Sequence, residues 1–401
     1  MSKHSCDYLI VGAGIVGLTV AHELKMRFPS AQICVLDKER KPGLHASGRN
    51  SGVLHSGIYY GSNTLKAKVC AAGAKRMMDF AHEHSIPFSK SGKVVVATAE
   101  KDLPTVDRLL RNAAENEIRA WRIDEKELRE IEPYAARCAA AIYSPDTGVI
   151  DSRAVVARLT LLLEQSGVHF LWCCGVRNAV KPGEVATDQG VLSYGYLFNC
   201  AGAYADVVAR HFGLCGSYAL VPFKGIYWKL RPESAHLVRA NIYPVPDIEL
   251  PFLGVHLTRV ISGDVYVGPT AIPALGRENY GFIRGIQPLE AVGIGYRLAG
   301  MYLRNRYNFR RMAHLELGKY RKCNFLAAAQ RLLPSLTSED MIPTEKSGIR
   351  PQLVNLREGK LEMDYIFEHT DCSTHVLNAI SPAFTSSFAF AEMIVNSSNV
   401  N

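Results

Sequence analysis

The chain of 401 residues lacks the features of a disulfide-bonded, a zinc-binding or a membrane-spanning protein. Its ten cysteines are scattered, only Cys173 and Cys174 are adjacent, and no Cys-x-x-Cys pair occurs, which favours reduced thiols and no metal. No apolar run reaches the roughly 18 residues that a membrane-spanning helix needs. The N-terminal MSKHSCDYLIVG enters an apolar run at once and leaves no room for a signal or transit peptide. We therefore expect a cytoplasmic protein, and its length favours two closely packed domains.

The positive charge of the chain is concentrated in one segment. Residues 284–331 contain eight arginines and two lysines against two glutamates, which equals the whole net charge of +8. Interleaved apolar residues such as Tyr302, Phe309 and Met312 predict amphipathic helices. Such a surface is a solvated helix face, a contact with an anionic membrane or a nucleic-acid site. No RNA-binding module accompanies it, so we expect no nucleic acid, and peripheral contact with the cytoplasmic membrane stays open.

The N-terminal part of the chain has the order strand, glycine turn, helix, strand and acid. The apolar run 7–11 is followed by Gly12, Gly14 and Gly17 in the spacing Gly-x-Gly-x-x-Gly, and then by a helical pattern. These glycines allow a tight turn, the approach of a pyrophosphate and close helix packing. The next apolar run ends in Asp37, which is placed to accept the hydroxyls of an unphosphorylated ribose. The arrangement predicts a site for an adenine dinucleotide.

Three later turns of small residues indicate FAD rather than NAD. The segment 43–61 is rich in serine and glycine where an NAD-binding chain would continue to alternate strands and helices, and a helix is expected after it at about 65–83. A strand at 196–200 ends in Ala201-Gly202-Ala203, and a strand predicted at 376–380 is followed by SPAFTSS and a last helix. The N-terminus of that helix would face an anionic or carbonyl group. Turns so far apart in sequence suit one long ligand, and FAD has the required length.

These motifs together resemble one family of flavoproteins. The glycine turn with Asp37, NSGVLHSGIYY at 50–60, FLGVHLT at 252–258, VGPTA at 267–271 and SPAFTSS at 381–387 look like the L-2-hydroxyglutarate dehydrogenases of the D-amino-acid oxidase superfamily. The resemblance covers nearly the whole chain. It implies an α/β fold (α+β overall) like that of D-amino-acid oxidase, with a Rossmann-like FAD-binding domain of residues 1–85, 146–215 and 345–401. A substrate domain with an antiparallel sheet, residues 86–145 and 216–344, is interleaved with it, and includes strands expected at 93–97, 224–230 and 265–267.

The resemblance also implies an activity. The family oxidises L-2-hydroxyglutarate to 2-oxoglutarate by hydride transfer to flavin N5, and passes the electrons to quinone of the respiratory chain or to oxygen. The basic segment would hold such an enzyme against a membrane that contains quinone. An FAD-dependent amino-acid, amine or glycerol-3-phosphate oxidoreductase is the alternative.

The reaction needs a base for the hydroxyl proton and a cation for the carboxylate beside it. Histidine is the usual base at neutral pH, and the resemblance places His55 and His256 at the active site without ranking them. A covalent bond to the flavin is an alternative role for His55. Arg350 resembles the arginine that holds the substrate carboxylate in D-amino-acid oxidases. The candidates for the second carboxylate are Tyr59, Lys224, Tyr227 and Arg259.

The same resemblance and the three turns assign a larger set of residues to FAD. Arg49 is expected at the pyrophosphate, and Asn50 and Ser51 are expected to offer hydrogen bonds to the cofactor. The whole set is Gly12, Gly14, Ile15, Val16, Gly17, Asp37, Lys38, Ser47, Arg49, Asn50, Ser51, Gly52, Val176, Ala201, Gly202, Gly348, Pro382, Ala383 and Thr385.

Overall fold

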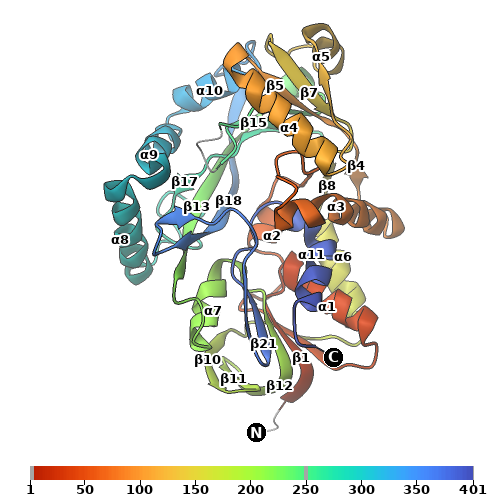
Figure 1. Cartoon of the computed structure of the whole chain (residues 1–401), viewed down its shortest axis with the longest axis vertical. Helices are drawn as coiled ribbons and strands as arrows, with labels where there is room; N and C mark the ends of the chain where they lie inside the picture. Colours follow the sequence, from red (N-terminus) through yellow and green to blue (C-terminus); the bar gives the residue numbers. More distant parts are fainter. Residues whose placement is uncertain (1–3, 248–251, 401) are drawn as a thin grey trace.

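The computed structural model describes residues 4–247 and 252–400, which form two large sheets, one small sheet and the helices around them (Figure 1). The first large sheet lies near both chain termini, and the second lies toward the opposite end of the molecule. Strands of both sheets come from distant parts of the sequence, so the two halves are interleaved along the chain.

The first sheet has eight strands and carries the glycine turn. Its parallel strands are β1 (His4–Val11), β2 (Ile33–Leu36), β9 (His169–Leu171), β12 (Gly190–Asn199) and β21 (Ser373–Val376). Antiparallel strands are β10 (Val176–Lys181), β11 (Glu184–Thr187) and β20 (Phe367–Thr370). Val11 lies opposite both Leu36 and Asn199, so the carboxyl ends of β1, β2 and β12 meet at the glycine turn. Ligands of open parallel sheets bind at this edge.

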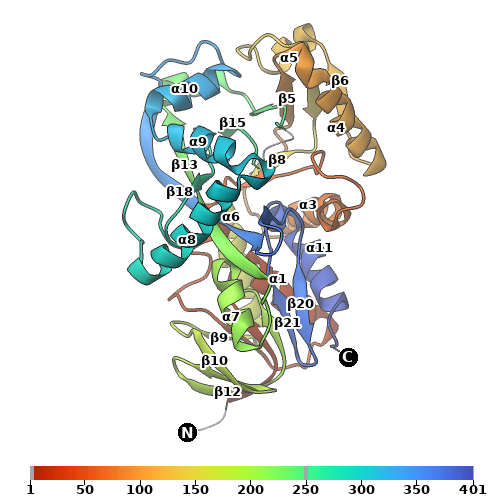
Figure 2. The same ribbon diagram turned by 60° about the vertical axis from the view of Figure 1, so that its left-hand side comes forward.

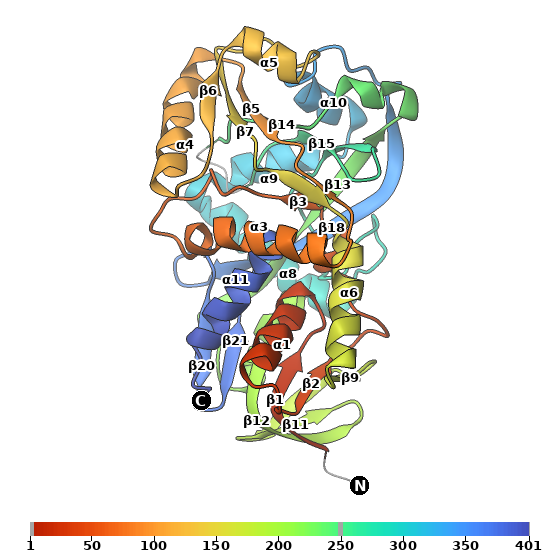
Figure 3. The same cartoon turned by 90° about the vertical axis from the view of Figure 1, so that its right-hand side faces the viewer.

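Three helices, α1 (Ile15–Arg27), α6 (Ser152–Gln165) and α11 (Ala383–Asn396), cover one face of the first sheet, and α3 (Leu65–Glu83) crosses above them and packs on α11 (Figure 3). The helix α7 (Ala205–His211) packs on the opposite face. The buried side chains of Ile10, Val35 and Phe198 join these helices in one core. The helix predicted at 65–83 is confirmed with the same bounds.

The strand predicted at 376–380 is wrong in its position. The strand β21 ends at Val376, and the following residues form a loop. The amide of Asn378 donates to the carbonyls of Glu362 (3.0 Å) and Asp364 (2.6 Å), which draws the backbone away from the sheet at this point. The apolar run at 376–380 is typical of a strand, and it does not show that Asn378 binds a loop.

The second sheet has ten strands. They are β5 (Lys93–Ala97), β6 (Trp121–Ile123), β7 (Ala140–Ser144), β13 (Tyr218–Leu230), β14 (Asn241–Pro244), β15 (His256–Arg259), β16 (Val265–Gly268), β17 (Ile272–Pro273), β18 (Met341–Asn355) and β19 (Lys360–Leu361). All pairs are antiparallel as predicted except β5 with β14, which is parallel. The boundary predicted at residue 345 falls inside β18, which pairs with β13 along its length.

The segment 50–60 runs from one half of the molecule to the other. Its β3 (Val53–Leu54) forms the small sheet with β4 (Phe88–Ser89) and β8 (Gly148–Ile150). Leu54 is part of the core under the first sheet, whereas Ile58 packs with the core of β5, β7 and α4 (Leu103–Glu115). The glycines and small side chains of this segment therefore pass through the junction of the two halves.

Three helices form the basic segment at the outer side of the second sheet (Figure 2). They are α8 (Pro288–Arg304), α9 (Phe309–Gly318) and α10 (Lys322–Gln330), so the predicted helices are confirmed. In the part of the chain that the structure describes, no helix is both long and apolar enough to cross a membrane. The remaining elements are α2 (Ala46–Arg49), α5 (Glu125–Ile131) and the 3₁₀ turns Glu100–Asp102, Gly202–Tyr204, Pro232–Leu237 and Arg306–Asn308.

Candidate active site

The glycine turn packs against the end of β12 and leaves no room for side chains. Gly12 has a φ of +107°, and a Cβ atom there would lie 2.6 Å from the carbonyl oxygen of Cys200. A Cβ atom on Gly17 would lie 2.0 Å from the carbonyl oxygen of Gly12. Both positions therefore require glycine, as the spacing predicted.

The first turn of α1 meets two other predicted cofactor residues. The N–H of Ile15 donates to Ser47 Oγ (2.9 Å), and Ser47 belongs to α2 in the serine-rich segment. Asp37 accepts the N–H groups of Ala13 (2.7 Å) and Glu39 (2.8 Å). Burial raises the pKa of Asp37, while these hydrogen bonds oppose the shift. The turn, the helix N-terminus and the acid thus lie together, as expected for a dinucleotide site.

Two further groups of predicted cofactor residues reach the same region from the C-terminal part of the chain: Gly348 on β18 and the turn that opens α11. A Cβ atom on Gly348 would lie 3.2 Å from the carbonyl oxygen of Arg49. Thr385, in the first turn of α11, accepts the N–H of His55 (3.2 Å) and donates to the carbonyl of Val53 (3.2 Å). Pro382 precedes α11, and no side chain caps this helix. The close approach of these backbones fits a long cofactor that lies along the junction.

Several predicted cofactor residues have local partners. The amide of Asn50 donates to the carbonyl of Ser47 (2.7 Å) and accepts the N–H of Gly52 (2.8 Å), so it shapes its own turn. Lys38 forms ion pairs with Glu39 and Glu278. The guanidinium of Arg49 lies 3.9 Å from the ring centroid of Tyr280. Of the other residues in the set, Ala201 lies beside Gly12, Val176 begins β10, and Gly202 begins the 3₁₀ turn after β12.

Four basic side chains face one another at the junction of the two halves. His55 comes from the segment 50–60, Lys93 from β5, His256 from β15 and Arg350 from β18. His256 and Lys93 share one neighbour, since the ring of His256 stacks on Tyr243 and Nζ of Lys93 lies 5.3 Å from the centroid of the same tyrosine. Lys93, His256 and Arg350 each add to the lowering of the pKa of His55, which fits all four in one cluster. The sequence predicted three of these four, and the structure brings all three together.

The ring of His256 is held in one orientation. It stacks on Tyr243 with a centroid distance of 4.0 Å and an interplanar angle of 18°, and its Nδ1 lies 2.9 Å from the carbonyl oxygen of Gly254. A carbonyl can only accept, so Nδ1 carries the hydrogen and Nε2 keeps a free lone pair. Burial lowers the pKa of His256 to about 3; the bond to Gly254 opposes this shift, and Arg350 and Lys93 add to it. The imidazole is therefore neutral at physiological pH and can accept a proton.

The side chain of His55 is neutral as well but is less constrained. Burial lowers its pKa to about 3, and the charges of Lys93, His256 and Arg350 add to the shift. Its Nδ1 is buried and has no hydrogen-bond partner among the residues that the structure describes. An unpaired buried polar atom at a predicted cofactor segment fits a group that is supplied by a ligand.

The four candidates for the second carboxylate differ in their positions. The ring of Tyr59 lies 4.5 Å from Nζ of Lys93. Burial raises the pKa of Tyr227 and the charge of Arg350 lowers it, so both tyrosines border the cluster. Nζ of Lys224 instead donates to the carbonyl of Gly281 (2.6 Å), beside the basic helices. Arg259 donates to the carbonyls of residues 235 and 238 (3.1 Å each).

Lys93 is the cluster residue that sequence reasoning missed. It opens the run KVVVA, which predicts a strand but gives no sign that its lysine is completely buried. A lysine at the start of an apolar strand usually extends to solvent. Only the packing of β5 against the segment 50–60 and β14 makes the position internal.

Comparisons with known proteins agree with this arrangement. The family model described as FAD dependent oxidoreductase (DAO) matches residues 7–397. The L-2-hydroxyglutarate dehydrogenase of Escherichia coli K12 is 34% identical over 97% of this chain and 92% of its own length. The mitochondrial L-2-hydroxyglutarate dehydrogenase of Nematostella vectensis is 35% identical over 97% of this chain and 90% of its own length.

Solved structures show the same fold at lower identity. The dithionite-reduced L-α-glycerophosphate oxidase of Mycoplasma pneumoniae with FAD bound has a TM-score of 0.78 and 21% identity, over 100% of this chain and 96% of that one. Glycine oxidase from Geobacillus kaustophilus has a TM-score of 0.74 and 17% identity, over 99% and 96% of the two chains. Fold, glycine cradle and family match together define an FAD-dependent oxidoreductase. Within that class the chain belongs to the family of L-2-hydroxyglutarate dehydrogenases.

Proposed function

We propose that this protein oxidises L-2-hydroxyglutarate to 2-oxoglutarate. The observation that carries the proposal is the basic cluster of His55, Lys93, His256 and Arg350, in which Lys93 and His256 are buried and the other two are partly buried. The neighbouring groups that lower the pKa of both histidines are basic, so the cluster suits a substrate with two negative charges. The relatives from Escherichia coli and Nematostella vectensis carry the name of this activity.

Each side chain of the cluster has a distinct part in the proposed reaction. Arg350 holds the carboxylate on C1, because a planar guanidinium binds both oxygens at once. Nε2 of His256 takes the hydroxyl proton as C2 becomes a carbonyl carbon. Among the neighbouring charges, that of Arg350 lowers the pKa of His256 the most, which fits a base next to the C1 carboxylate. The glycine turn, Ser47 and the first turn of α11 would hold FAD, which would supply the acceptor for the hydride from C2.

The alternative substrates differ in charge. An amino acid or amine carries an ammonium group, which would be repelled by a basic cluster. Glycerol 3-phosphate is an anion and would tolerate the same charges, so it remains the rival substrate. Anaerobic mixing with L-2-hydroxyglutarate, its D enantiomer, glycerol 3-phosphate and L-glutamate, with flavin absorbance near 450 nm as the readout, separates these cases. Bleaching by glycerol 3-phosphate or L-glutamate, with no response to L-2-hydroxyglutarate, would refute the proposed substrate.

The electron acceptor is proposed to be a quinone in a membrane to which the basic helices attach. More than half of the large hydrophobic side chains that are exposed among the described residues lie between 282 and 320. On α8, Leu289 (92% exposed), Val292, Tyr296 (82%) and Leu303 follow helical spacing and form one apolar stripe. Arginines flank the stripe at positions 297 and 304. An exposed apolar stripe with basic neighbours suits insertion into an anionic membrane surface.

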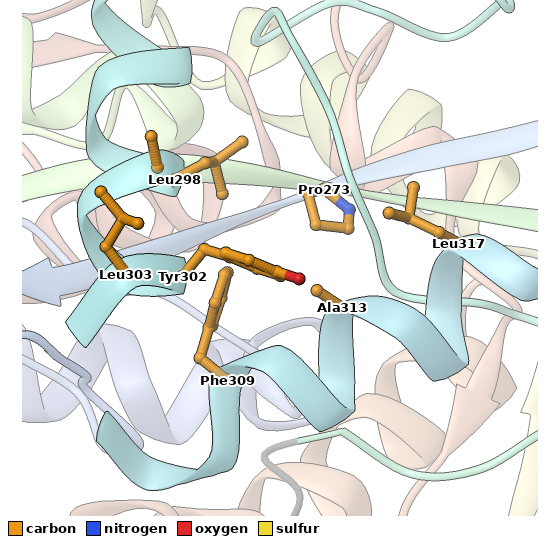
Figure 4. A pocket seen from close by; sticks show the side chains of 8 residues that line it. Pro273, Leu298, Tyr302, Leu303, Phe309, Ala313 and Leu317 are labelled. Atoms are coloured by element: carbon orange, nitrogen blue, oxygen red, sulfur yellow. The ribbon is translucent and has the colours of Figure 1, made fainter. Parts of the chain in front are cut away.

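An apolar pocket opens between α8 and α9 next to this stripe (Figure 4). Its lining consists of Pro273, Leu298, Ala299, Tyr302, Leu303, Phe309, Ala313 and Leu317. A pocket without charged side chains at a membrane-facing surface supports a quinone as the acceptor.

Sedimentation with phosphatidylglycerol vesicles tests the membrane contact. A variant with Leu289→Glu, Val292→Glu and Tyr296→Glu is expected to remain in the supernatant, whereas wild type sediments in low salt and partly in high salt. Met26→Glu, which changes an exposed apolar residue outside the stripe, is the matched control and should sediment like wild type. Equal sedimentation of the triple variant and wild type would refute the contact. Flavin reoxidation by a short-chain quinone that is no faster than by dissolved oxygen would refute the quinone.

A further inference from the structure

The side chain of Lys93 is buried in a way that calls for a partner. Its exposed fraction is 0%, and Nζ has no hydrogen-bond partner within residues 4–247 and 252–400. Nζ lies 4.5 Å from the ring centroid of Tyr59 and 5.3 Å from that of Tyr243. Aromatic faces attract an ammonium group but do not replace three lost hydrogen bonds. A buried amine in this state is costly unless another group joins it.

The groups that face Lys93 do not provide an anion. They are Cys70 from α3, His55 and Tyr59 from the segment 50–60, Tyr243 from β14 and His256 from β15. Burial raises the pKa of Cys70 to about 12 and raises that of Tyr59 well above its usual value, so both groups are uncharged at neutral pH. Both histidines are neutral for the reasons given above. Among the described residues that face Lys93, none supplies a counter-charge for its protonated form, and an anionic ligand can supply one.

Arg350 and Lys93, the two cluster residues other than the histidines, lie on opposite sides of His256 in the second sheet. The strand order β18-β13-β16-β15-β14-β5 separates Arg350 on β18 from Lys93 on β5. Among neighbouring charges, that of Arg350 lowers the pKa of His256 the most, whereas that of Lys93 lowers the pKa of His55 the most. A ligand with an anionic group at each end can therefore join Arg350 to Lys93 and pass the two histidines.

We propose that Lys93 binds the distal carboxylate of the substrate and thereby selects a dicarboxylic over a monocarboxylic 2-hydroxy acid. The hydroxyl of Tyr59, which is also buried without a partner among the described residues, donates a second hydrogen bond to that carboxylate. This assignment rests on the proposed oxidation of L-2-hydroxyglutarate. It makes Lys93 a specificity residue and leaves the proton transfer to the histidines.

Lys93→Met tests the assignment because methionine keeps the length of the side chain and removes its charge. L-2-hydroxypentanoate is the matched substrate, since it has the same carbon chain without the distal carboxylate. We expect Lys93→Met to lower the second-order rate constant of anaerobic flavin reduction by L-2-hydroxyglutarate at least about 100-fold. The constant for L-2-hydroxypentanoate should change less than about threefold, because this substrate has no distal carboxylate for Lys93 to bind. Comparing both substrates with both enzymes, as in a double-mutant cycle, isolates the interaction between Lys93 and that carboxylate. Equal losses for both substrates would overturn the assignment.

Lys224→Met is the control variant. Lys224 is almost as buried as Lys93, but its Nζ already donates to the carbonyl of Gly281. The variant should keep the wild-type preference for the dicarboxylate. Loss of that preference in Lys224→Met, with Lys93→Met unaffected, would transfer the role to Lys224. A wild-type enzyme that L-2-hydroxyglutarate does not reduce would refute the proposed function, and the binding measurement below would still test Lys93.

Ligand binding to wild type gives a second measurement that needs no variant. Glutarate and pentanoate share the carboxylate for Arg350 and differ at the distal end, so the ratio of their dissociation constants reports the distal site alone. Burial lowers the pKa of Lys93 to about 7. The preference for glutarate, read from perturbation of the flavin spectrum, should therefore weaken by up to tenfold per pH unit above about pH 7. A preference that is constant from pH 6 to 9, or no preference at all, would overturn the assignment.

Discussion

At the scale of single residues, the two histidines of the cluster have a different role from Arg350 and Lys93. His55 and His256 lose their charge because they are buried among other basic groups, so neither can neutralise a carboxylate. A neutral imidazole can take a proton from an alcohol, whereas the guanidinium of Arg350 cannot. Anion binding therefore belongs to Arg350 and, by the inference above, to Lys93. The histidines are left free for proton transfer.

We predict that His256→Gln slows flavin reduction by L-2-hydroxyglutarate by roughly 10²- to 10⁴-fold, the usual worth of a positioned base. His55→Gln should have a smaller effect, since the ring of His55 has no partner that fixes its tautomer among the described residues. Rapid anaerobic mixing of the two variants, each with its FAD content measured, gives the comparison. A larger loss in His55→Gln would make His55 the base.

The pH dependence of the wild-type reaction checks the same assignment. A base with a pKa of about 3 stays deprotonated from pH 8 down to pH 5. The second-order rate constant for reduction should then show no acid limb in this range. A limb with a midpoint near 6 would mean that the base is not held neutral by its surroundings.

The folding stability of Lys93→Met gives a prediction that is independent of the reaction. The pKa of Lys93 is about 7 in the folded chain and about 10.4 in an unfolded one, so between these values the unfolded chain binds more protons. The free energy of unfolding of wild type therefore rises with pH in this window, and the cost of burying the amine is complete below it. We expect Lys93→Met to melt at least ~2 °C above wild type at pH 6, with a smaller difference at pH 9. A lower melting temperature at pH 6 would identify Lys93 as a structural residue.

At the scale of elements, the FAD cradle formed by the glycine turn at residues 12–17 depends on backbone contacts that one extra atom breaks. We predict that Gly17→Ala loses most of its FAD, because the new Cβ would meet the carbonyl oxygen of Gly12 at 2.0 Å and separate α1 from β1. Gly295→Ala on α8 is the control, since nothing lies within 4 Å of its Cβ position. That change should stabilise the helix by about 0.5–1 kcal/mol. The absorbance ratio at 280 and 450 nm after gel filtration measures FAD content in both variants.

Elements also show which part of the molecule can be predicted from its sequence. The glycine turn, α3 and β5 follow from local patterns, because periodicity and glycine spacing are properties of adjacent residues. The strand predicted at 376–380 is wrong because the side chain of Asn378 binds a loop more than ten residues away. Lys93 was missed for the same reason. Its surroundings are made by strands that are distant in sequence, and a local pattern contains no record of them.

At the scale of the whole molecule, the segment that leads into α8 also reaches the cofactor cradle. Arg277 is buried and binds the carboxylates of Asp206 on α7 (2.5 Å) and Glu290 on α8 (2.7 Å). The next residue, Glu278, accepts hydrogen bonds from Lys38 (2.6 Å) and from the hydroxyl of Tyr204 (2.8 Å). The helices proposed to meet the membrane are thus fixed to the cofactor end of the first sheet by the buried Arg277–Asp206 pair and the partly exposed Lys38–Glu278 pair.

This connection predicts a joint loss of stability and cofactor in Arg277→Met. Removal of one partner from a buried ion pair costs about 3–5 kcal/mol, because Asp206 would remain buried without its main counter-charge. We expect a lower melting temperature, faster release of FAD and earlier proteolysis within residues 277–290. Arg119→Met, which removes an exposed pair with Asp146, should leave all three measurements unchanged. Destabilisation of Arg277→Met without faster FAD release would mean that the network supports the fold but does not transmit the position of α8 to the cradle.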